Sequence, residues 1–329
     1  MPRNIAVGLG LMEFPFAGAA GFWRWVDLCE KGGVDSLWQT DRIVSREPIL
    51  EAMTMMAAVA GRTRRLKFGV NVMSLAFRDP VLCAKQLATI DVMSDGRLLP
   101  AFGIGSPLAP KWQALAIDTK TRGRKTDEGL EVIRRLWTGE PVDFDGVHYR
   151  LNGAAIAPKP VQPDLPMWIG GSSEAAIRRT ARFGTGWQAG GETADQIGAV
   201  VARIREAAAD AGRPIDEDHY GCGIAFRFGR RDDPGLMGVM EAYRRRTGRD
   251  PERHFAVGEA SDIVQRIAAF VDAGISKFIL RAAARGDDEV LAQTRRLIDE
   301  VLPIVAARWP RQKKRPAASF ETALRASSG

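Results

Sequence analysis

The sequence has few of the residues that build disulfides and metal centres. Its 329 residues include three cysteines, Cys29, Cys83 and Cys222, and three histidines. No C-x-x-C pair is present, and the histidines lack the short paired spacing of a metal site. We therefore expect no disulfide framework and no metal. Widely separated single cysteines are typical of reduced thiols, which predicts a cytoplasmic location.

Long hydrophobic runs are also missing. The apolar run at residues 5–12 is shorter than the hydrophobic region of a signal peptide. No run approaches the roughly 18 apolar residues that are needed to span a membrane. The sequence therefore predicts neither secretion nor a membrane anchor.

The positive charge is concentrated at the carboxyl end. The net charge is +7, and residues 311–329 contain five basic residues and one glutamate. Basic character confined to a terminal segment lacks the clustered face that nucleic-acid binding requires. We expect no nucleic-acid partner, and a single domain over residues 1–309 followed by a flexible basic tail over residues 310–329.

Short apolar segments alternate with longer helical patterns up to about residue 305. The expected strands are 5–11, 36–40, 66–73, 98–104, 167–171, 186–189, 220–228 and 277–280. The expected helices are 22–31, 49–60, 81–93, 124–137, 174–183, 194–211, 237–246, 261–273 and 287–306. Eight successive strand–helix units predict a closed (β/α)₈ TIM barrel of the α/β class. An open doubly wound sheet is the alternative, but its G-x-G-x-x-G fingerprint is reduced to Gly8 and Gly10.

An insertion interrupts this order after the fourth unit, at about residues 139–166. Within it, residues 142–151 alternate between apolar and polar, and Asp145-Gly146 is a strong turn signal for a β-hairpin. The apolar side chains of the hairpin need a surface to cover. We expect the hairpin to pack over the barrel mouth near the fourth and fifth strands and to exclude water there.

Several segments resemble the luciferase-like monooxygenase superfamily. They are 33–42 (GVDSLWQTDR), 78–80 (RDP), 84–91 (AKQLATID), 94–97 (SDGR), 122–128 (RGRKTDE), 136–139 (LWTG), 157–163 (APKPVQP), 168–173 (WIGGSS) and 184–187 (GTGW). Their order and spacing fit over roughly residues 5–305. Together the segments indicate the superfamily but not a substrate.

The resemblance implies a bacterial-luciferase-like barrel, a homodimer or higher homo-oligomer, and FMN or the 8-hydroxy-5-deazaflavin coenzyme F-420. Members that use FMN are mostly monooxygenases supplied with reduced flavin by a separate reductase. Deazaflavin members move hydride to or from alcohols, sugar phosphates or imines. We expect an FMN-dependent monooxygenase that acts with O₂ on a small organic substrate. A deazaflavin-dependent dehydrogenase or reductase and a non-catalytic flavin-binding barrel are the alternatives.

Barrel enzymes place their sites at the carboxyl ends of the strands, which selects candidates by position. Asp41 and Arg42 follow the second strand, where many relatives carry Asp-His. Arginine stays protonated, so Arg42 cannot shuttle a proton near neutral pH. We predict that Asp41 and Arg42 are catalytic, with Arg42 clamping an anionic substrate or stabilising negative charge that develops on the flavin. A salt bridge at the rim is the alternative for Arg42.

Two further strand ends are predicted to hold the cofactor ring. Gly103, Gly105 and Ser106 follow the fourth strand, where glycines let the backbone approach a ring closely. Asn71 and Val72 end the third strand, and the resemblance implies a non-prolyl cis peptide there, behind the central ring.

The fifth strand leads into a candidate phosphate site. Gly170, Gly171, Ser172 and Ser173 run directly into a predicted helix, whose first backbone amides form a ready anion site. We predict that this segment holds the cofactor phosphate, with an ordinary glycine turn and a serine N-cap as the alternative. Arg281, just past the eighth strand, is predicted to add its charge to the same phosphate.

Overall fold

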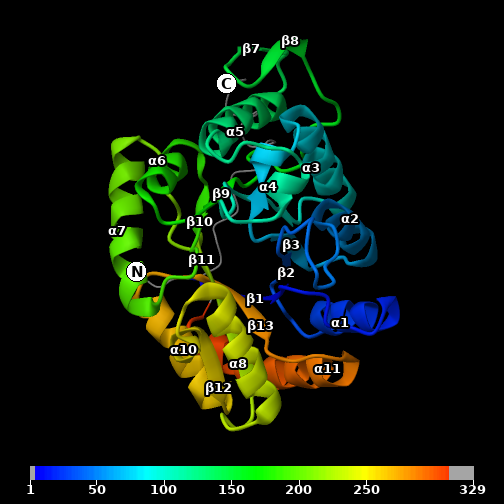
Figure 1. The fold of residues 1–329 in the computed structure, drawn as a ribbon, viewed down its shortest axis with the longest axis vertical. Coiled ribbons are helices and arrows are strands. Elements are labelled where there is room, and N and C mark those ends of the chain that lie inside the picture. The colour runs from blue at the N-terminus through cyan, green and yellow to red at the C-terminus, as the bar shows by residue number, and fades with distance from the viewer. Residues whose placement is uncertain (1–3, 311–329) are drawn as a thin grey trace, which may run out of the picture.

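Parallel strands arranged in a ring form the centre of the structure (Figure 1). This computed structural model describes residues 4–310, so the predicted basic tail at 311–329 lies outside the described part. The strands of the ring are β1 (Ala6–Leu11), β2 (Ser36–Gln39), β3 (Lys67–Val70), β4 (Met73–Ser74), β5 (Leu98–Leu99), β6 (Ala101–Gly103), β9 (Trp168–Gly170), β10 (Gly186–Gln188), β11 (Tyr220–Phe228) and β13 (Lys277–Ala282).

These strands occupy eight positions, as predicted. The third position is divided into β3 and β4 at Asn71–Val72, and the fourth into β5 and β6 at Pro100. β3 pairs with β5 and β4 pairs with β6, so the divided positions are neighbours along both halves. The order β1, β2, β3/β4, β5/β6, β9, β10, β11, β13 returns to β1, and all these neighbours are parallel. The predicted (β/α)₈ barrel is confirmed.

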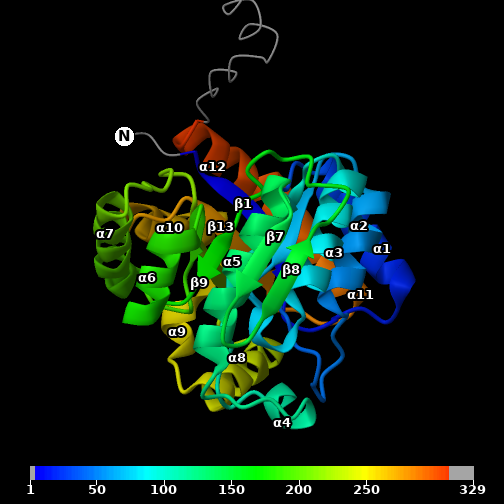
Figure 2. The same cartoon turned by 90° about the horizontal axis from the view of Figure 1, so that it is seen from above.

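Most of the helices cover the outside of the ring, whereas α4 and α8 lie at one end of it (Figure 2). They are α1 (Ala19–Lys31), α2 (Ala52–Arg62), α3 (Pro80–Ser94), α4 (Lys111–Ala114), α5 (Arg122–Thr138), α6 (Glu174–Phe183), α7 (Ala194–Asp210), α8 (Pro234–Thr247), α9 (Pro251–His254), α10 (Ala260–Asp272), α11 (Asp287–Arg296) and α12 (Leu302–Arg308). Capping explains where several of them begin. The side chains of Asp79 and Asp233 accept hydrogen bonds from the backbone of α3 and α8, and a proline follows each aspartate at the first helical position.

The last predicted helix, residues 287–306, is divided in the structure. A π-helical turn at Leu297–Val301 separates α11 from α12. Pro303 lies just beyond this turn, and proline has no N–H and crowds the carbonyl four residues earlier. The helix therefore widens where the proline prevents regular α-helical hydrogen bonding.

An additional segment between β11 and β13 shapes the site. It contains α8, α9 and the strand β12 (Phe255–Gly258). β11 is nine residues long, and its second half pairs with β12, from Ala225 opposite Phe255 to Phe228 opposite Gly258. This pairing holds α8 and α9 at the carboxyl end of the barrel.

Tryptophans fill the inside of the barrel. Trp38 on β2 and Trp168 on β9 are buried, with their ring centroids 6.3 Å apart. A Cβ on Gly69 would lie 2.8 Å from the Trp38 ring, and one on Gly186 would lie 2.5 Å from the Trp168 ring. These glycines leave room for the two large rings, which close the barrel below its carboxyl end.

The predicted hairpin is present, but the expectation that it covers the barrel mouth is wrong. It consists of β7 (Val142–Asp145) and β8 (Arg150–Ala154), paired antiparallel. The Glu128 carboxylate on α5 accepts hydrogen bonds from the backbone of Val147, His148 and Tyr149. Figure 1 shows the hairpin on the outer side of α5, far from α8. Val142 is buried and Phe144, Tyr149 and Leu151 are partly buried against the core, whereas Val147 is 85% exposed.

Replacing Glu128 with alanine is expected to lower the free energy of unfolding by about 1 kcal/mol, because three backbone donors lose a charged acceptor. Cofactor affinity should not change, since the hairpin is remote from the carboxyl ends of the strands. Chemical unfolding and a cofactor titration measure the two quantities. Glu128→Gln, which keeps one acceptor, is the control. A weakened cofactor affinity in Glu128→Ala would restore the prediction that the hairpin protects the site.

The three cysteines are buried and unpaired in the structure. Burial raises the pKa of the Cys83 thiol to about 12, and it also raises the pKa of Cys29 and Cys222. The expected absence of disulfides among them is confirmed. Within residues 4–310, every helix is too short or too polar to cross a bilayer.

Candidate functional site

A cavity of about 870 Å³ opens at the carboxyl ends of the strands. Its walls come from the ends of β1, β9, β10, β11 and β13, from the peptide after β3, and from α8. The charged and titratable residues that line it are Glu13, Glu47, Glu192, Cys222, Tyr243, Arg246, Arg249, His254, Arg281 and Arg285. This is the position at which barrel enzymes build their sites.

The Asn71–Val72 peptide bond is cis, as the resemblance implied. Both residues line the cavity. A Cβ on Gly103 would lie 2.7 Å from the Val72 side chain, and one on Gly170 would lie 2.9 Å from it. Glycines on both neighbouring strands therefore make space for Val72 at the cavity floor.

The residues after β6 do not line the cavity. Gly103 lies behind Val72, whereas Gly105 lies beside Ser74 and Trp112. Ser106 is exposed, and its carbonyl accepts a hydrogen bond from the indole of Trp112 at 2.7 Å. The chain turns outward after β6 into α4, which carries Gly105 and Ser106 away from the other candidates.

The segment from Gly170 to Ser173 combines both interpretations that the sequence left open. Ser173 is the N-cap of α6, because its hydroxyl accepts a hydrogen bond from the Ala176 amide at 3.3 Å. Gly170 and Gly171 also line the cavity, and Gly171 has a φ of +106°. The Ser172 hydroxyl is buried without a hydrogen-bond partner among the described residues. Ser172 and Ser173 do not themselves line the cavity, so the capped start of α6 lies just behind the two glycines.

Asp41 is engaged by other residues and does not line the cavity. Its carboxylate accepts hydrogen bonds from both terminal nitrogens of Arg78, at 2.7 and 2.8 Å, and from the Ser74 amide at 2.8 Å. Only 1% of the Asp41 side chain is exposed. The structure places Asp41 as a tie between the end of β2 and the end of β4.

Arg42 lies behind the cavity wall. Its Nη2 donates to the Met12 carbonyl at 2.9 Å. Burial lowers its pKa, with a further lowering by Arg246, while Glu13 and Glu47 oppose the shift. An arginine remains charged under such a shift, so Arg42 contributes positive potential to this side of the cavity.

Arg281 lines the cavity, but on the side away from Gly170–Ser173. A Cβ on Gly223 of β11 would lie 2.6 Å from its Nη2. Its electrostatic neighbours are Tyr243, Cys222, Arg246 and Arg42. None of these belongs to the segment that was predicted to hold the cofactor phosphate.

Several cavity residues were not predicted from the sequence, and Gln188 and His254 are two of them. Gln188 ends β10, and both atoms of its amide are buried without a hydrogen-bond partner in the described chain. His254 ends α9 and packs beside Tyr243, with ring centroids 5.6 Å apart. Burial lowers the pKa of His254, and Arg249, Arg253 and Arg266 lower it further. The rule of strand ends would have selected Gln188, whereas no motif marks His254.

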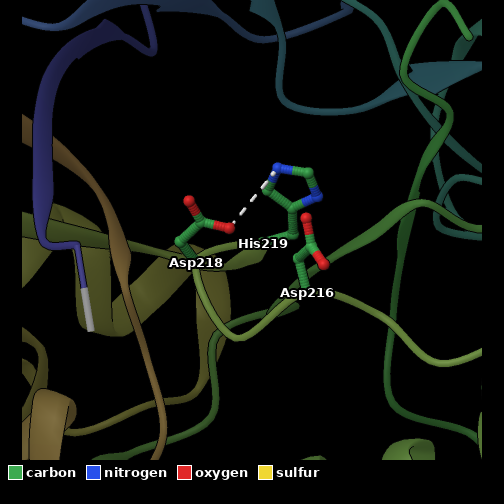
Figure 3. A group of neighbouring side chains, drawn as sticks. All are labelled: Asp216, Asp218 and His219. Carbon is green, nitrogen blue, oxygen red and sulfur yellow. Dashed lines mark ion pairs between the residues drawn. The ribbon is translucent and has the colours of Figure 1, made fainter. Parts of the chain in front are cut away.

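Three potential metal ligands meet at the opposite end of the barrel (Figure 3). Donor atoms of Asp216, Asp218 and His219 lie within 4.8 Å of one another. His219 Nδ1 lies 2.8 Å from the Thr185 carbonyl, and its Nε2 lies 3.7 Å from Asp218. The cluster precedes β11 and therefore takes no part in the cavity. The absence of a metal stays a prediction.

Comparison with known proteins places the chain among barrel oxidoreductases. Residues 17–245 match the family described as luciferase-like monooxygenase. An uncharacterised protein of Mycobacterium tuberculosis is 33% identical over 168 residues, which are 51% of this chain and 57% of that protein. An F-420-dependent glucose-6-phosphate dehydrogenase of Nocardia farcinica is 32% identical over 201 residues, 57% of this chain and 59% of that protein. The chain thus spans little more than half the length of these curated relatives.

Solved structures of the same fold are also found. The crystal structure of the monooxygenase RslO1 from Streptomyces bottropensis superposes with a TM-score of 0.79 at 21% identity. The match covers 92% of this chain and 100% of that chain.

Proposed function

Because the chain belongs to the luciferase-like monooxygenase family, we propose that it transfers hydride between coenzyme F-420 and a small alcohol or carbonyl substrate. Membership supports a flavin- or F-420-dependent oxidoreductase. The observation that carries the finer proposal is His254, an imidazole on the cavity wall whose pKa is lowered by burial. Alcohol oxidation releases a proton as well as a hydride, and a neutral histidine is suited to accept that proton.

The cavity residues fit a flavin-like group. Gly10, Gly170 and Gly223 leave its floor without side chains, and Gln188 offers a buried donor and acceptor that have no protein partner. Such an amide complements the alternating carbonyl and N–H groups of a pyrimidinedione edge. The amides at the start of α6 and the free Ser172 hydroxyl suit a phosphate.

Each residue then has a separate task in the proposed reaction. When bound, F-420 would supply the hydride acceptor or donor. Val72 and the floor glycines would support the flat ring, and Gln188 would fix its orientation. His254 would take the proton from the substrate hydroxyl during oxidation and return it to the carbonyl oxygen during reduction. Arg42 would contribute fixed positive potential without exchanging a proton.

The relatives support F-420 more than FMN, since the Nocardia protein is named as F-420-dependent. FMN-dependent monooxygenation, expected from the sequence alone, is the second candidate, and the Streptomyces protein of similar fold is named as a monooxygenase. A separate flavin reductase would be a partner only in that case. A homodimer or higher homo-oligomer is proposed for either reaction.

A fluorescence titration of the full chain with F-420 and with FMN tests the cofactor. We expect the dissociation constant for F-420 to be at least tenfold lower than that for FMN, a difference of about 1.4 kcal/mol. Tighter binding of FMN, together with substrate-dependent oxygen consumption, would support the second candidate and overturn the first. If the chain binds neither cofactor, both candidate reactions and the non-catalytic flavin-binding barrel are rejected.

Replacing Gly171 with valine is expected to weaken cofactor binding at least tenfold, about 1.4 kcal/mol. Gly171 has a φ of +106°, a conformation that a branched side chain strains, so the backbone that leads into α6 would shift and move the Ser172 hydroxyl from the phosphate position. Gly212→Val is the matched control, because Gly212 also has a positive φ, of +66°, but follows α7 away from the cavity. Equal cofactor affinity in the two variants would reject the assignment of the cofactor phosphate to Gly170–Ser173.

A further inference from the structure

Arg281 is a half-buried cation with no anionic partner among residues 4–310. Its Nε is buried and makes no hydrogen bond. The side chain leaves β13 and crosses two neighbouring strands. A Cβ on Gly10 of β1 would lie 3.3 Å from its Cγ, and one on Gly223 of β11 would lie 2.6 Å from its Nη2. The two glycines therefore let the arginine lie flat on the cavity floor.

The charges that act on Arg281 have its own sign. Arg246 and Arg42 lie near enough to disfavour its charge, and its other electrostatic neighbours are the Tyr243 hydroxyl and the Cys222 thiol. Glu13 is a carboxylate of the cavity wall, but it is already paired with Arg246 at 3.4 Å and Arg285 at 3.1 Å. Glu47 and Glu192 also line the cavity, but neither is among the groups that act on Arg281. The described chain therefore provides positive potential at this point and no paired carboxylate.

A buried charge without a partner lowers the stability of a fold unless an opposite charge compensates it.

The Gln188 amide is a second unpartnered polar group on the same cavity floor. A Cβ on Gly221 would overlap its Oε1, so its amide lies over Gly221 as Arg281 lies over Gly223. These glycines are two residues apart on one face of β11, about 7 Å along the strand. The two groups are neighbours, but a neutral amide and a guanidinium select different partners.

We propose that Arg281 binds an anionic oxygen group of the substrate, a carboxylate or a phosphate, with Arg42 and Arg246 adding to the positive potential. This inference rests on the proposed function, which assigns the cofactor phosphate to Gly170–Ser173 and leaves Arg281 for a second anion. A guanidinium binds such groups through two parallel hydrogen bonds. The substrate class is thus a small alcohol or carbonyl compound that carries a carboxylate or a phosphate.

Inorganic phosphate and acetate are the probes for the test. Each is titrated into the cofactor-loaded full chain, with sodium chloride at matched ionic strength, and the melting temperature and tryptophan fluorescence are followed. We expect saturable binding of at least one probe to the wild type and at least tenfold weaker binding to Arg281→Met. Cofactor affinity in Arg281→Met should stay within twofold of the wild type. Arg230→Met is the control, since Arg230 is 85% exposed, is paired with Asp232 and does not line the cavity.

Stability without probe separates a binding role from a structural one. Arg281→Met removes an uncompensated, half-buried charge, so we expect its melting temperature to equal or exceed that of the wild type. A lower melting temperature would identify a structural arginine and overturn the proposal. Equal probe binding in wild type and Arg281→Met would also overturn it.

The cofactor measurements distinguish this inference from the proposed function. If Arg281→Met weakens cofactor binding tenfold or more, the charge serves the cofactor, and the inference fails while the proposed function stands. If the wild type binds no cofactor, the proposed function fails. In that case the probes are titrated into the cofactor-free protein. Binding that depends on Arg281 would still support an anionic ligand at this position, and absence of such binding would overturn the inference as well.

Discussion

Replacing Asp41 with alanine is expected to lower the free energy of unfolding by about 3–5 kcal/mol, the range for breaking a buried ion pair from one side. Asp41 accepts two hydrogen bonds from Arg78 and one from the Ser74 amide. Without it, Arg78 keeps only Glu51 at 3.7 Å as a carboxylate partner. The Arg78 side chain is 11% exposed, so water replaces little of what is lost. Chemical denaturation of the two proteins measures the difference.

An exposed ion pair supplies the control for Asp41. Arg230 and Asp232 pair at 2.7 Å with side chains 85% and 65% exposed, and such pairs contribute at most about 1 kcal/mol. Asp232→Ala should therefore change stability little. An equally small effect of Asp41→Ala would contradict the structural role that its contacts indicate.

A double variant separates the structural role of Asp41 from the catalytic one predicted from sequence. Asp41→Asn with Arg78→Met removes both charges of the ion pair. We expect it to recover part of the stability lost in Asp41→Ala, because the pair is lost as a unit. Turnover that recovers together with stability would make Asp41 a positioning residue. Turnover that stays absent in a stably folded double variant would make it catalytic.

The barrel could be predicted because its signal is repeated eight times. Apolar segments of strand length alternate with amphipathic patterns of helix length, and few architectures satisfy that order. The divided third and fourth strands could not be predicted in the same way. They depend on how Asn71–Val72 and Pro100 sit between neighbouring strands. The hairpin was predicted from its turn, but its location was not, because alternation shows which face needs cover and not what covers it.

The rule that barrel sites lie at the carboxyl ends of strands correctly selected some of the cavity residues and wrongly selected others. It led to Asn71, Val72, Gly170, Gly171 and Arg281, which line the cavity. It cannot tell which way a residue faces, since neighbouring residues of a strand point to opposite sides. For that reason, the rule also selected Asp41, Gly105 and Ser106, which lie outside the lining.

The cavity residues contributed by α8 and α9 were beyond the sequence argument. Tyr243 and Arg246 lie on α8, and His254 ends α9, in the segment between β11 and β13. The segment reaches the cavity because β12 pairs with the far half of β11, a contact between residues about 30 positions apart. Nothing in the residues around His254 marks it as a cavity residue until this pairing is known.

Replacing His254 with glutamine is expected to lower kcat for alcohol oxidation at least 100-fold at pH 7, within the range typical for losing a general base. Cofactor affinity should be unchanged, because His254 is assigned to the substrate proton and not to the ring or the phosphate. Stopped-flow reduction of F-420 measures the rate, and a fluorescence titration measures the affinity. His219→Gln is the control, since His219 lies at the opposite end of the barrel. A turnover rate within threefold of the wild type would reject His254 as the proton acceptor.

The pH dependence gives a second, independent readout of His254. Burial and three arginines lower its pKa from the ordinary 6.5, so the neutral form persists to lower pH than in a free histidine. The acidic limb of kcat/KM in the wild type should therefore lie below pH 6.5. Arg249→Met removes one of those cations and should move the limb to higher pH, because the charged imidazole becomes easier to form. A limb that stays in place, or moves to lower pH, would contradict the assignment.

The lowered pKa of His254 also affects stability. The unfolded chain binds this proton more readily than the folded chain, so the free energy of unfolding falls as the pH drops through 6.5. His254→Gln should lose that part of the acid sensitivity.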